Sequence, residues 1–373
     1  MRRLRFMVTG GGTGGHIYPA LAVAQGLRQR FPECEVLYVG TVGGLEADIV
    51  PRTGLPFATI RAAGLKRRLT LQNLRAMALA FQGVGQALRL VRDFKPIVVV
   101  GTGGYVSGPV LLAARLCRIP VLIHEQNAFP GLTNRLFARW AGCVALTFPE
   151  AVRYLPRSAR VKVTGLPVRE EVLRADREEA RARLGVETGQ TVLLSFGGSR
   201  GAERLNRAVA GIIQVLGGRP DIRIYHATGT AGYEDFLGLL HVRGIDPSGQ
   251  GNITIKPYFY QMADYLAAAD LVVCRAGAAT IAELTCMGRP AILVPYPYAA
   301  ANHQEFNARA LEEKGAAVVV RDAELTEDRL LREVKRLLAA PAELRLMAER
   351  SAQLGRPDAL ERILVCIENL AGL

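Results

Sequence analysis

Short apolar runs alternate with longer amphipathic stretches along the whole chain. Continuous Val/Ile/Leu runs such as 97–100 are typical of parallel strands covered on both faces, and strand–helix alternation predicts doubly wound α/β sheets. In the first half, the predicted strands are 4–8, 35–40, 97–101, 120–124 and 143–147, and the helical patterns include 16–30, 70–92 and 105–117. In the second half, the predicted strands are 191–196, 222–227, 253–255, 270–274, 290–294 and 316–320.

This alternation predicts two domains of the same class. A chain of 373 residues with 50% hydrophobic composition has enough apolar residues for two cores. We place the boundary near Gly165-Leu166-Pro167, which gives a first domain of 1–165 and a second of 166–340. The helices of 341–373 have no strand after them, and we expect them to pack back toward the first domain.

Each half contains a strand that runs into a glycine-rich turn followed by a helix. The first turn is Gly10-Gly11-Gly12-Thr13-Gly14-Gly15-His16, and the second begins at Gly197 and ends at Ala202. Backbone N–H groups and the helix dipole converge at such a turn and attract anions. Two of them predict a phosphorylated ligand bound between two similar domains, as in enzymes that join a nucleotide-activated group to an acceptor.

Several common nucleotide sites are disfavoured. A dinucleotide fold needs an acid at the end of its second strand, and here that strand ends in glycines with the first acid at Glu46. The chain has no G-K-[ST] sequence and no D-x-D sequence. We therefore expect neither a cofactor nor a metal, with the diphosphate charge met by amides, hydroxyls and arginine.

Composition and charge indicate the cellular compartment and the kind of partner. The six cysteines form no metal-ligand pattern and are typical of reduced thiols in a cytoplasmic protein. The sequence shows no signal peptide and no apolar run long enough to span a membrane. The net charge of +13 indicates an anionic partner, but the basic residues are dispersed and do not favour nucleic acid.

Further polar segments follow predicted strands and so lie at the carboxyl edge, where ligands of α/β sheets bind. They are 101–109, which is a third glycine-rich turn, 124–127, 274–283 and 302–304. Small residues at the start of the helix in 274–283 would let a diphosphate approach the backbone, and Glu283 would accept hydrogen bonds from ribose hydroxyls.

Five of these motifs together resemble the MurG family of peptidoglycan glycosyltransferases, which add N-acetylglucosamine (GlcNAc) to lipid I. They are G-G-T-G-G-H at 11–16, G-G-Y-V-S-G-P at 103–109, H-E-Q-N at 124–127, G-G-S-x-G-A at 197–202 and C-R-A-G-A-x-T-x-x-E at 274–283. The resemblance covers nearly the whole chain in the same order. It implies a GT-B fold, with two Rossmann-like domains facing a cleft. Departures from the family pattern occur at Leu166, Arg200, Ala279 and Ala282.

The resemblance also implies site residues. His16 is the candidate general base, because a neutral imidazole accepts a proton near neutral pH. The implied acceptor contacts are Gly103, Gly104, Tyr105, Ser107, His124 and Glu125. The implied donor contacts are Thr13, Gly14, Gly15, Asn127, Arg169, Ser199, Phe259 (through its backbone), Ala278, Ala279, Thr280, Ile281, Ala282, Glu283 and Gln304.

An acceptor that is an anionic lipid requires a membrane-facing surface. We expect peripheral binding to the cytoplasmic side of the bacterial plasma membrane, since basic and exposed apolar side chains together give reversible association. The candidate residues are Lys66, Arg67, Arg68, Leu71, Leu74, Arg75 and Phe81. Further expected partners are UDP-GlcNAc, lipid I and cell-wall synthesis proteins.

The sequence leaves alternatives open for several segments, for single site residues and for the function of the whole chain. The apolar stripe of 71–84 is either a membrane face or ordinary core, the third glycine turn binds the lipid diphosphate or allows close helix packing, and His124 and Glu125 either brace their loop or touch the acceptor. Asn127, Arg169, Glu283 and Gln304 also fit ordinary turn, surface and helix roles. The chain as a whole could serve another acceptor, epimerise UDP-GlcNAc, or act as a non-catalytic nucleotide-sugar scaffold.

Overall fold

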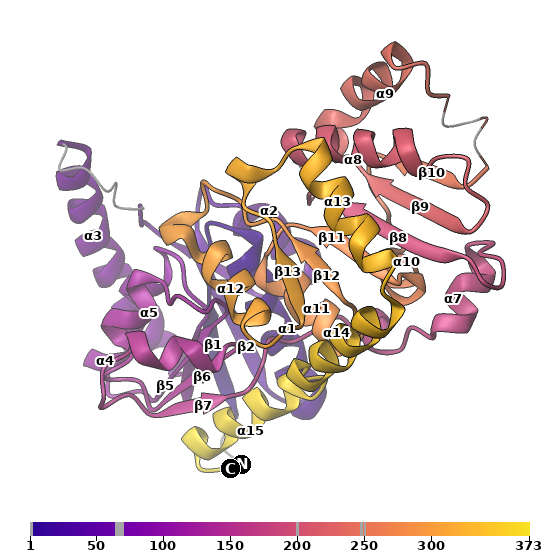
Figure 1. Cartoon of the computed structure of the whole chain (residues 1–373). Helices are drawn as coiled ribbons and strands as arrows, with labels where there is room; N and C mark the ends of the chain where they lie inside the picture. The colour runs from indigo at the N-terminus through magenta and orange to yellow at the C-terminus, as the bar shows by residue number, and fades with distance from the viewer. Residues whose placement is uncertain (1–2, 64–70, 199–200, 247–248, 250) are drawn as a thin grey trace. The chain divides into compact units, whose positions relative to one another are not determined.

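The computed structural model describes residues 3–63, 71–198, 201–246, 249 and 251–373, with backbone only for 71–78 and 80. The chain divides into two compact units (Figure 1). Unit 1 contains Met1–Pro167 and Pro357–Leu373, and unit 2 contains Val168–Arg356. Both units are α/β, as the alternation predicts.

The centre of unit 1 is a parallel seven-stranded sheet in the order β3-β2-β1-β4-β5-β6-β7. Its strands are β1 (Arg5–Thr9), β2 (Glu35–Thr41), β3 (Phe57–Ile60), β4 (Val98–Gly101), β5 (Val121–Glu125), β6 (Cys143–Leu146) and β7 (Val161–Val163). Its helices are α1 (Gly14–Arg30), α2 (Glu46–Ile49), α3 (Leu71–Phe94), α4 (Ser107–Leu116), α5 (Leu132–Phe137) and α15 (Ala359–Ala371), with 3-10 turns at Pro51–Thr53 and Pro149–Tyr154.

Both faces of this sheet are covered, which explains its continuous apolar strands. Phe6 and Val8 of β1 point into a core shared with α1 and α15. Met7, between them, points into a core that α3 and α4 complete on the opposite face. Alternate residues of one strand therefore serve two cores.

Strands β3 and β7 are absent from the prediction, and both lie at sheet edges. Their burial is incomplete, and Lys162 in the middle of β7 is exposed. An edge strand needs no continuous apolar run, so its signal in the sequence is weak.

Unit 2 contains a parallel six-stranded sheet in the order β10-β9-β8-β11-β12-β13. Its strands are β8 (Thr191–Phe196), β9 (Ile222–Ala227), β10 (Ile253–Lys256), β11 (Leu271–Cys274), β12 (Ala291–Leu293) and β13 (Ala317–Val319). Its helices are α6 (Glu170–Leu173), α7 (Arg177–Arg183), α8 (Glu203–Leu216), α9 (Tyr233–Val242), α10 (Met262–Ala268), α11 (Ala278–Cys286), α12 (His303–Glu312), α13 (Glu327–Leu338) and α14 (Pro341–Leu354), with 3-10 turns at Thr230–Gly232, Ala300–Asn302 and Asp322–Glu324.

The two terminal helices belong to different units. Helix α15 packs on α1 (Figure 1). The Cβ of any residue replacing Gly26 of α1 would lie 3.0 Å from Leu360 Cδ1 of α15. Arg30 at the end of α1 pairs with Glu361 at 2.6 Å and with Glu368. Helix α14 instead packs against α11 and α13 of unit 2. The expected return of 341–373 to the first domain thus applies to α15 alone.

Candidate functional site

The first glycine turn leads directly from β1 into α1. Thr13 is the N-cap residue in extended conformation, and the helix begins at Gly14. The first turn of α1 contains Gly14, Gly15 and His16 and has no acidic side chain. The His16 N–H donates to the Thr13 carbonyl at 3.1 Å. The helix start is where the sequence predicts it, and anion binding there stays a prediction.

A buried carboxylate supports this turn from behind. Glu46 Oε2 accepts from the Gly12 N–H at 3.0 Å, and Oε1 accepts from Thr41 N and Oγ1 at 3.1 and 2.7 Å. Glu46 is fully buried, so its oxygens serve the protein itself. The acid that follows the second strand is therefore occupied in shaping the turn, which agrees with the absence of a dinucleotide signature.

The third glycine turn packs directly on the first. Gly104 has φ +84°, and a Cβ there would lie 2.2 Å from the Gly11 carbonyl oxygen. Ser107 donates to the Gly103 carbonyl at 2.7 Å and is fully buried. Tyr105 is half-buried, and its ring would meet a Cβ at position 12. Close packing is thus one role of this turn, and acceptor binding stays a prediction.

A chain of hydrogen bonds joins His16 to the end of β5. His16 Nδ1 lies 3.0 Å from Gln126 Oε1, and Gln126 Nε2 lies 3.0 Å from His124 Nδ1. His124 Nε2 lies 2.9 Å from the Gly165 carbonyl oxygen. Burial lowers the pKa of His124 to about 4. The candidate base is therefore connected to a buried, neutral histidine.

The next residue along the chain, Glu125, is committed to its own loop. Its Oε1 accepts from Asn127 N at 2.9 Å and from Asn127 Nδ2 at 3.3 Å, and its Oε2 accepts from Gly131 N and Asn134 Nδ2 at 2.9 and 2.8 Å.

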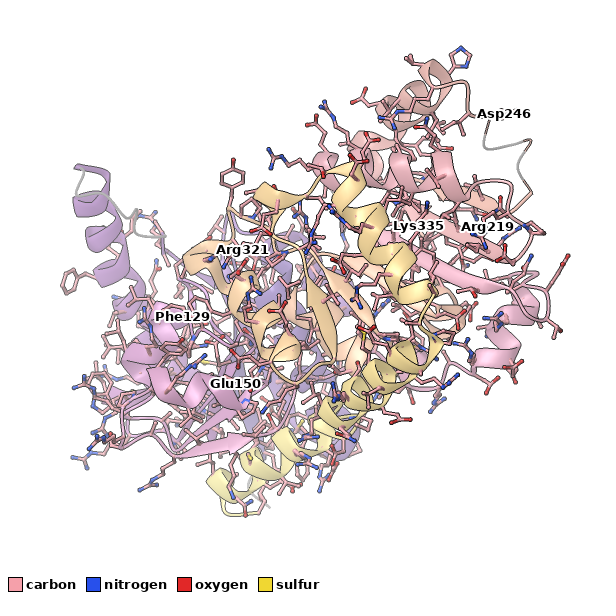
Figure 2. All side chains as sticks on the ribbon, in the orientation of Figure 1. Phe129, Glu150, Arg219, Asp246, Arg321 and Lys335 are labelled. Carbon is pink, nitrogen blue, oxygen red and sulfur yellow. The ribbon has the colours of Figure 1, made fainter. Side chains whose placement is uncertain are left out.

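The same loop also makes an aromatic contact. Phe129, labelled in Figure 2, packs edge-on against the Tyr154 ring at 4.7 Å.

These contacts support the bracing interpretation of Glu125 and His124. Both side chains are buried and bonded within the protein. Their contact with an acceptor, and that of Asn127 with a donor, stay predictions.

In unit 2, the second glycine turn follows β8 and precedes α8. Ser199 and Arg200 lie outside the described residues. Gly201 has φ +79°, and a Cβ there would lie 2.2 Å from the Thr228 carbonyl oxygen. Only glycine allows this approach of the turn to the end of β9.

Helix α11 begins at Ala278 with Gly277 as its N-cap, so the helix start predicted as a diphosphate site is present. Ala279 is exposed, Ala278 and Thr280 are half-buried, and Ile281 and Ala282 are buried, so the last two offer a ligand backbone at most. Glu283 Oε1 accepts from Arg169 Nε at 2.9 Å. Burial raises the pKa of Glu283, and the charge and hydrogen bond of Arg169 offset part of that rise.

Gln304 and Arg275 organise the loop after β12. Gln304 Oε1 accepts from Tyr296 N at 2.9 Å. Arg275 Nη1 donates to the carbonyls of Val294 and Pro295 and pairs with Asp322 at 2.6 Å. The side chain predicted to bind the sugar thus lies at the first turn of α12, held against this loop.

Phe259 is buried, and its ring stacks on Tyr265 at 3.9 Å and packs edge-on against Tyr225 at 6.3 Å. The side chain is therefore core, and a contact to a base through its backbone stays a prediction.

Some of the predicted membrane residues can be placed. Lys66, Arg67 and Arg68 lie outside the described residues, and Leu71, Leu74 and Arg75 lie in α3, described by backbone only. Phe81 of α3 is 74% exposed, whereas Ala87 and Val91 are buried under the same helix. The end of α3 is therefore core, and Phe81 is not.

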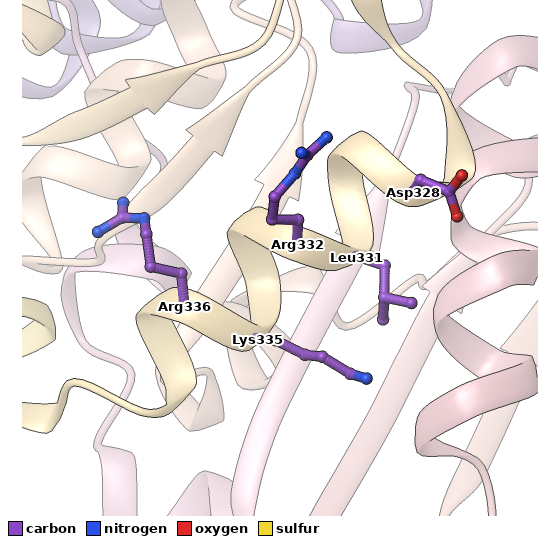
Figure 3. Close-up of a pocket in the computed structure, with 5 residues that line it drawn as sticks. All are labelled: Asp328, Leu331, Arg332, Lys335 and Arg336. Atoms are coloured by element: carbon purple, nitrogen blue, oxygen red, sulfur yellow. The ribbon is translucent and has the colours of Figure 1, made fainter.

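A shallow hollow of about 560 Å³ on unit 2 is lined by Asp328, Leu331, Arg332, Lys335 and Arg336 of α13 and holds none of the predicted site residues (Figure 3). Within the described ranges, no group of three or more His, Cys, Asp or Glu is arranged to hold a metal. Among the helices described, none has the length and hydropathy to cross a membrane.

Two residues central to this geometry were not predicted. Gln126 belongs to the H-E-Q-N motif, but its partner His16 is 110 positions away. In the sequence, Glu46 stands out only as an acid that lies too far past the second strand to mark a dinucleotide site. Its place after a strand and within a glycine-rich stretch was the available signal.

The chain matches two family models. Residues 6–146 match the glycosyltransferase family 28 N-terminal domain, and residues 192–363 match the glycosyltransferase family 28 C-terminal domain. The first match covers the glycine turns of unit 1, and the second covers α8, α11 and α12.

Full-length relatives agree with these matches. The chain is 56% identical over 369 residues to a UDP-N-acetylglucosamine–N-acetylmuramyl-(pentapeptide) pyrophosphoryl-undecaprenol N-acetylglucosamine transferase of Desulforudis audaxviator, covering 99% of each chain. It is 53% identical over 364 residues to the protein of the same name from Moorella thermoacetica, covering 98% of each. The crystal structure of Acinetobacter baumannii MurG is similar with a TM-score of 0.81 at 32% identity, covering 98% of this chain and 99% of that one.

Proposed function

This chain belongs to the MurG glycosyltransferases of family 28, and we propose that it transfers GlcNAc from UDP-GlcNAc to lipid I, giving lipid II for peptidoglycan synthesis. The observation that carries this proposal is the identity of 56% over 99% of both chains with a relative named for that reaction. Another acceptor, an epimerase and a non-catalytic scaffold are correspondingly disfavoured.

The mechanism follows from the groups in each unit. The 4-hydroxyl of the acceptor N-acetylmuramic acid attacks the anomeric carbon of GlcNAc opposite UDP and inverts it from α to β. His16 takes the hydroxyl proton, while the start of α11 and Arg169 stabilise the departing UDP. Charge-assisted hydrogen bonds contribute roughly 1.5–3 kcal/mol each, which supports a reaction without a metal. Glu283 holds the ribose, and Asn127 and Gln304 bind the sugar.

The test is transfer of labelled GlcNAc to lipid I in detergent with EDTA present. We compare wild type with His16→Ala and, as a matched control, His241→Ala, because His241 is an exposed histidine of α9. Loss of His16 is expected to lower kcat by roughly 100- to 10,000-fold with UDP-GlcNAc binding retained.

Each contrary outcome identifies a different error. UDP binding without a lipid-linked disaccharide would mean that the acceptor is wrong. An active His16→Ala variant would mean that another group takes the proton. Loss of transfer in EDTA that added Mg²⁺ restores would contradict the metal-free mechanism.

We further infer that the enzyme binds the cytoplasmic membrane surface through α3, α4 and α5. These helices pack side by side, and they and the turn after α5 expose large apolar side chains: Phe81, Leu116, Leu132, Leu136 and Trp140. Exposed apolar groups close to arginines such as Arg139, whose guanidinium lies over Trp140, fit an anionic lipid surface.

Flotation with vesicles that contain anionic lipid tests this surface. Leu136→Ser and Trp140→Ser together are expected to reduce binding, whereas Val242→Ser, which removes an exposed apolar residue of unit 2, leaves it unchanged. Equal loss in both would contradict the assignment. Binding to cell-wall synthesis proteins remains an expectation from the family.

A further inference from the structure

The hydrogen-bond chain at His16 has a fixed starting point. The Gly165 carbonyl oxygen can only accept, so His124 Nε2, 2.9 Å away, must carry a proton. His124 is fully buried, and burial lowers its pKa to about 4, so near neutral pH the ring has a single N–H. Its Nδ1 is therefore a bare acceptor.

This state of His124 determines the orientation of Gln126. The atom facing the bare Nδ1 at 3.0 Å must be the amide nitrogen. The same nitrogen lies 3.0 Å from the His124 carbonyl oxygen, where the amide oxygen would face another acceptor. Two independent contacts thus place Nε2 toward His124 and Oε1 toward His16.

The orientation of Gln126 then determines the proton on His16. Gln126 Oε1 lies 3.0 Å from His16 Nδ1 and can only accept, so Nδ1 carries the proton. In a neutral imidazole the lone pair is then on Nε2. Gly103 packs on the same ring, because a Cβ there would lie 3.0 Å from His16 Nδ1 and Cε1. The ring is therefore held on two sides.

We propose that Gln126 is a positioning residue that, through His124 and the Gly165 carbonyl, holds His16 in the Nδ1–H tautomer with Nε2 free to act as the base. This inference rests on the proposed function. During transfer the acceptor O–H proton moves to His16 Nε2 as the bond from that oxygen to the anomeric carbon forms and the bond to UDP breaks. The imidazolium keeps its Nδ1–H bonded to Gln126.

The wild-type protein provides the direct test. The chain has five histidines, so ¹⁵N-histidine labelling gives a small set of ring signals, and His16→Gln assigns the one of interest. For the neutral ring we expect a protonated Nδ1 and a bare Nε2. A proton on Nε2 instead would overturn the proposal, whether or not the protein transfers GlcNAc.

Two variants separate tautomer control from structural support. Gln126→Leu removes all three hydrogen bonds of the amide. We expect a mixture of His16 tautomers and an unchanged KM for UDP-GlcNAc, with kcat lowered by about 10-fold or more, up to the roughly 100- to 10,000-fold that a general base contributes. Gln126→Glu keeps an oxygen facing His16 Nδ1 and, in its protonated form, a hydroxyl facing the bare Nδ1 of His124, so we expect the wild-type tautomer and partial recovery of kcat.

A matched control is Gln190→Leu, which removes an amide that bridges Glu187 N and the Pro220 carbonyl in unit 2. It should leave the His16 signals and kcat unchanged. Equal losses in Gln126→Leu and Gln126→Glu, or a wild-type tautomer in Gln126→Leu, would show a merely structural role. Failure of the proposed function is distinct, because it appears as UDP binding without a lipid-linked disaccharide in the wild-type protein, whichever tautomer His16 adopts.

Discussion

The polar groups around the glycine turns differ between the two units. In unit 1, Glu46 and Glu125 are buried, and every contact described for their oxygens is to unit 1 itself. In unit 2, Arg169 is 45% exposed in its side chain and pairs with Glu283, and Gln304 binds a loop N–H. Unit 1 is supported by buried carboxylates that bond to the protein, whereas unit 2 has a half-exposed arginine paired with a carboxylate and an amide that binds a loop N–H.

This difference fits two roles, a turn of fixed shape in unit 1 and exchangeable side-chain contacts in unit 2. A buried carboxylate is costly to disturb, so it suits a turn that must keep its shape through the reaction. A partly exposed ion pair contributes little to stability, so its members can exchange partners at small cost. Side chains of unit 2 can therefore replace contacts within the protein by contacts to a ligand, whereas the buried carboxylates of unit 1 keep their positions.

The largest effect on stability is expected from removing Glu46, the buried carboxylate that supports the first glycine turn of unit 1. Glu46→Ala leaves three donors without their acceptor, and since each costs about 1–3 kcal/mol, the free energy of unfolding should fall by about 3 kcal/mol or more. Urea unfolding measures this loss. Asp48→Ala, an exposed acid in the same short helix, is the control and should change little. Similar stability of both variants would contradict the role of Glu46.

Acid should weaken both units through one buried histidine each. Burial lowers the pKa of His124 to about 4 and that of His226 to about 3, so the unfolded chain binds more protons below pH 6.5. Stability is therefore complete above pH 6.5 and falls as the pH drops toward 4, by roughly 3 kcal/mol for His124. Hydrogen exchange at β5 and β9 against pH would follow each unit, and His226→Phe should flatten only the β9 curve.

A smaller effect is expected in unit 2, and on binding rather than folding. Glu283→Ala should weaken UDP-GlcNAc binding by about 1.5–3 kcal/mol, or roughly 10- to 100-fold, with little change in unfolding. Calorimetric titration measures the affinity. Glu171→Ala removes the other carboxylate that pairs with Arg169 and should leave it unchanged. Equal weakening by the two variants would remove the ribose role of Glu283.

The smallest effect on stability is expected from the ion pairs between Arg30 of α1 and α15. Arg30→Met removes ion pairs to Glu361 and Glu368 on an exposed face, where water and salt screen the charges. The unfolding midpoint should match wild type at physiological salt, with a small loss at low salt. A large loss in both conditions would mean that these pairs anchor the helix, in place of the Leu360 packing.

The sequence allowed prediction of elements in which one property dominates. Val98–Val100 is apolar throughout because the strand is buried on both faces, so β4 was found. Val161–Val163 contains an exposed lysine at an edge, so β7 was missed. Glycine turns were found because backbone positions such as Gly104 and Gly201 exclude other residues.

Contacts between segments that lie far apart in the sequence could not be predicted from local patterns. Gln126 matters because the fold brings it to His16, and no local pattern encodes that pairing. The same holds for Arg275 and Asp322, which meet across the loop after β12. The family resemblance supplied the residue types of the site, and the structure supplied their partners.

The placement of α15 has a consequence for how the protein is made. Unit 2 lies in the sequence between two parts of unit 1, so a ribosome completes unit 2 while α1 still lacks the helix that covers it. Domains usually fold in the order in which they are synthesised. Here the second unit can finish first, and the apolar face of α1 stays open to chaperones until residues 357–373 have been made and can cover it.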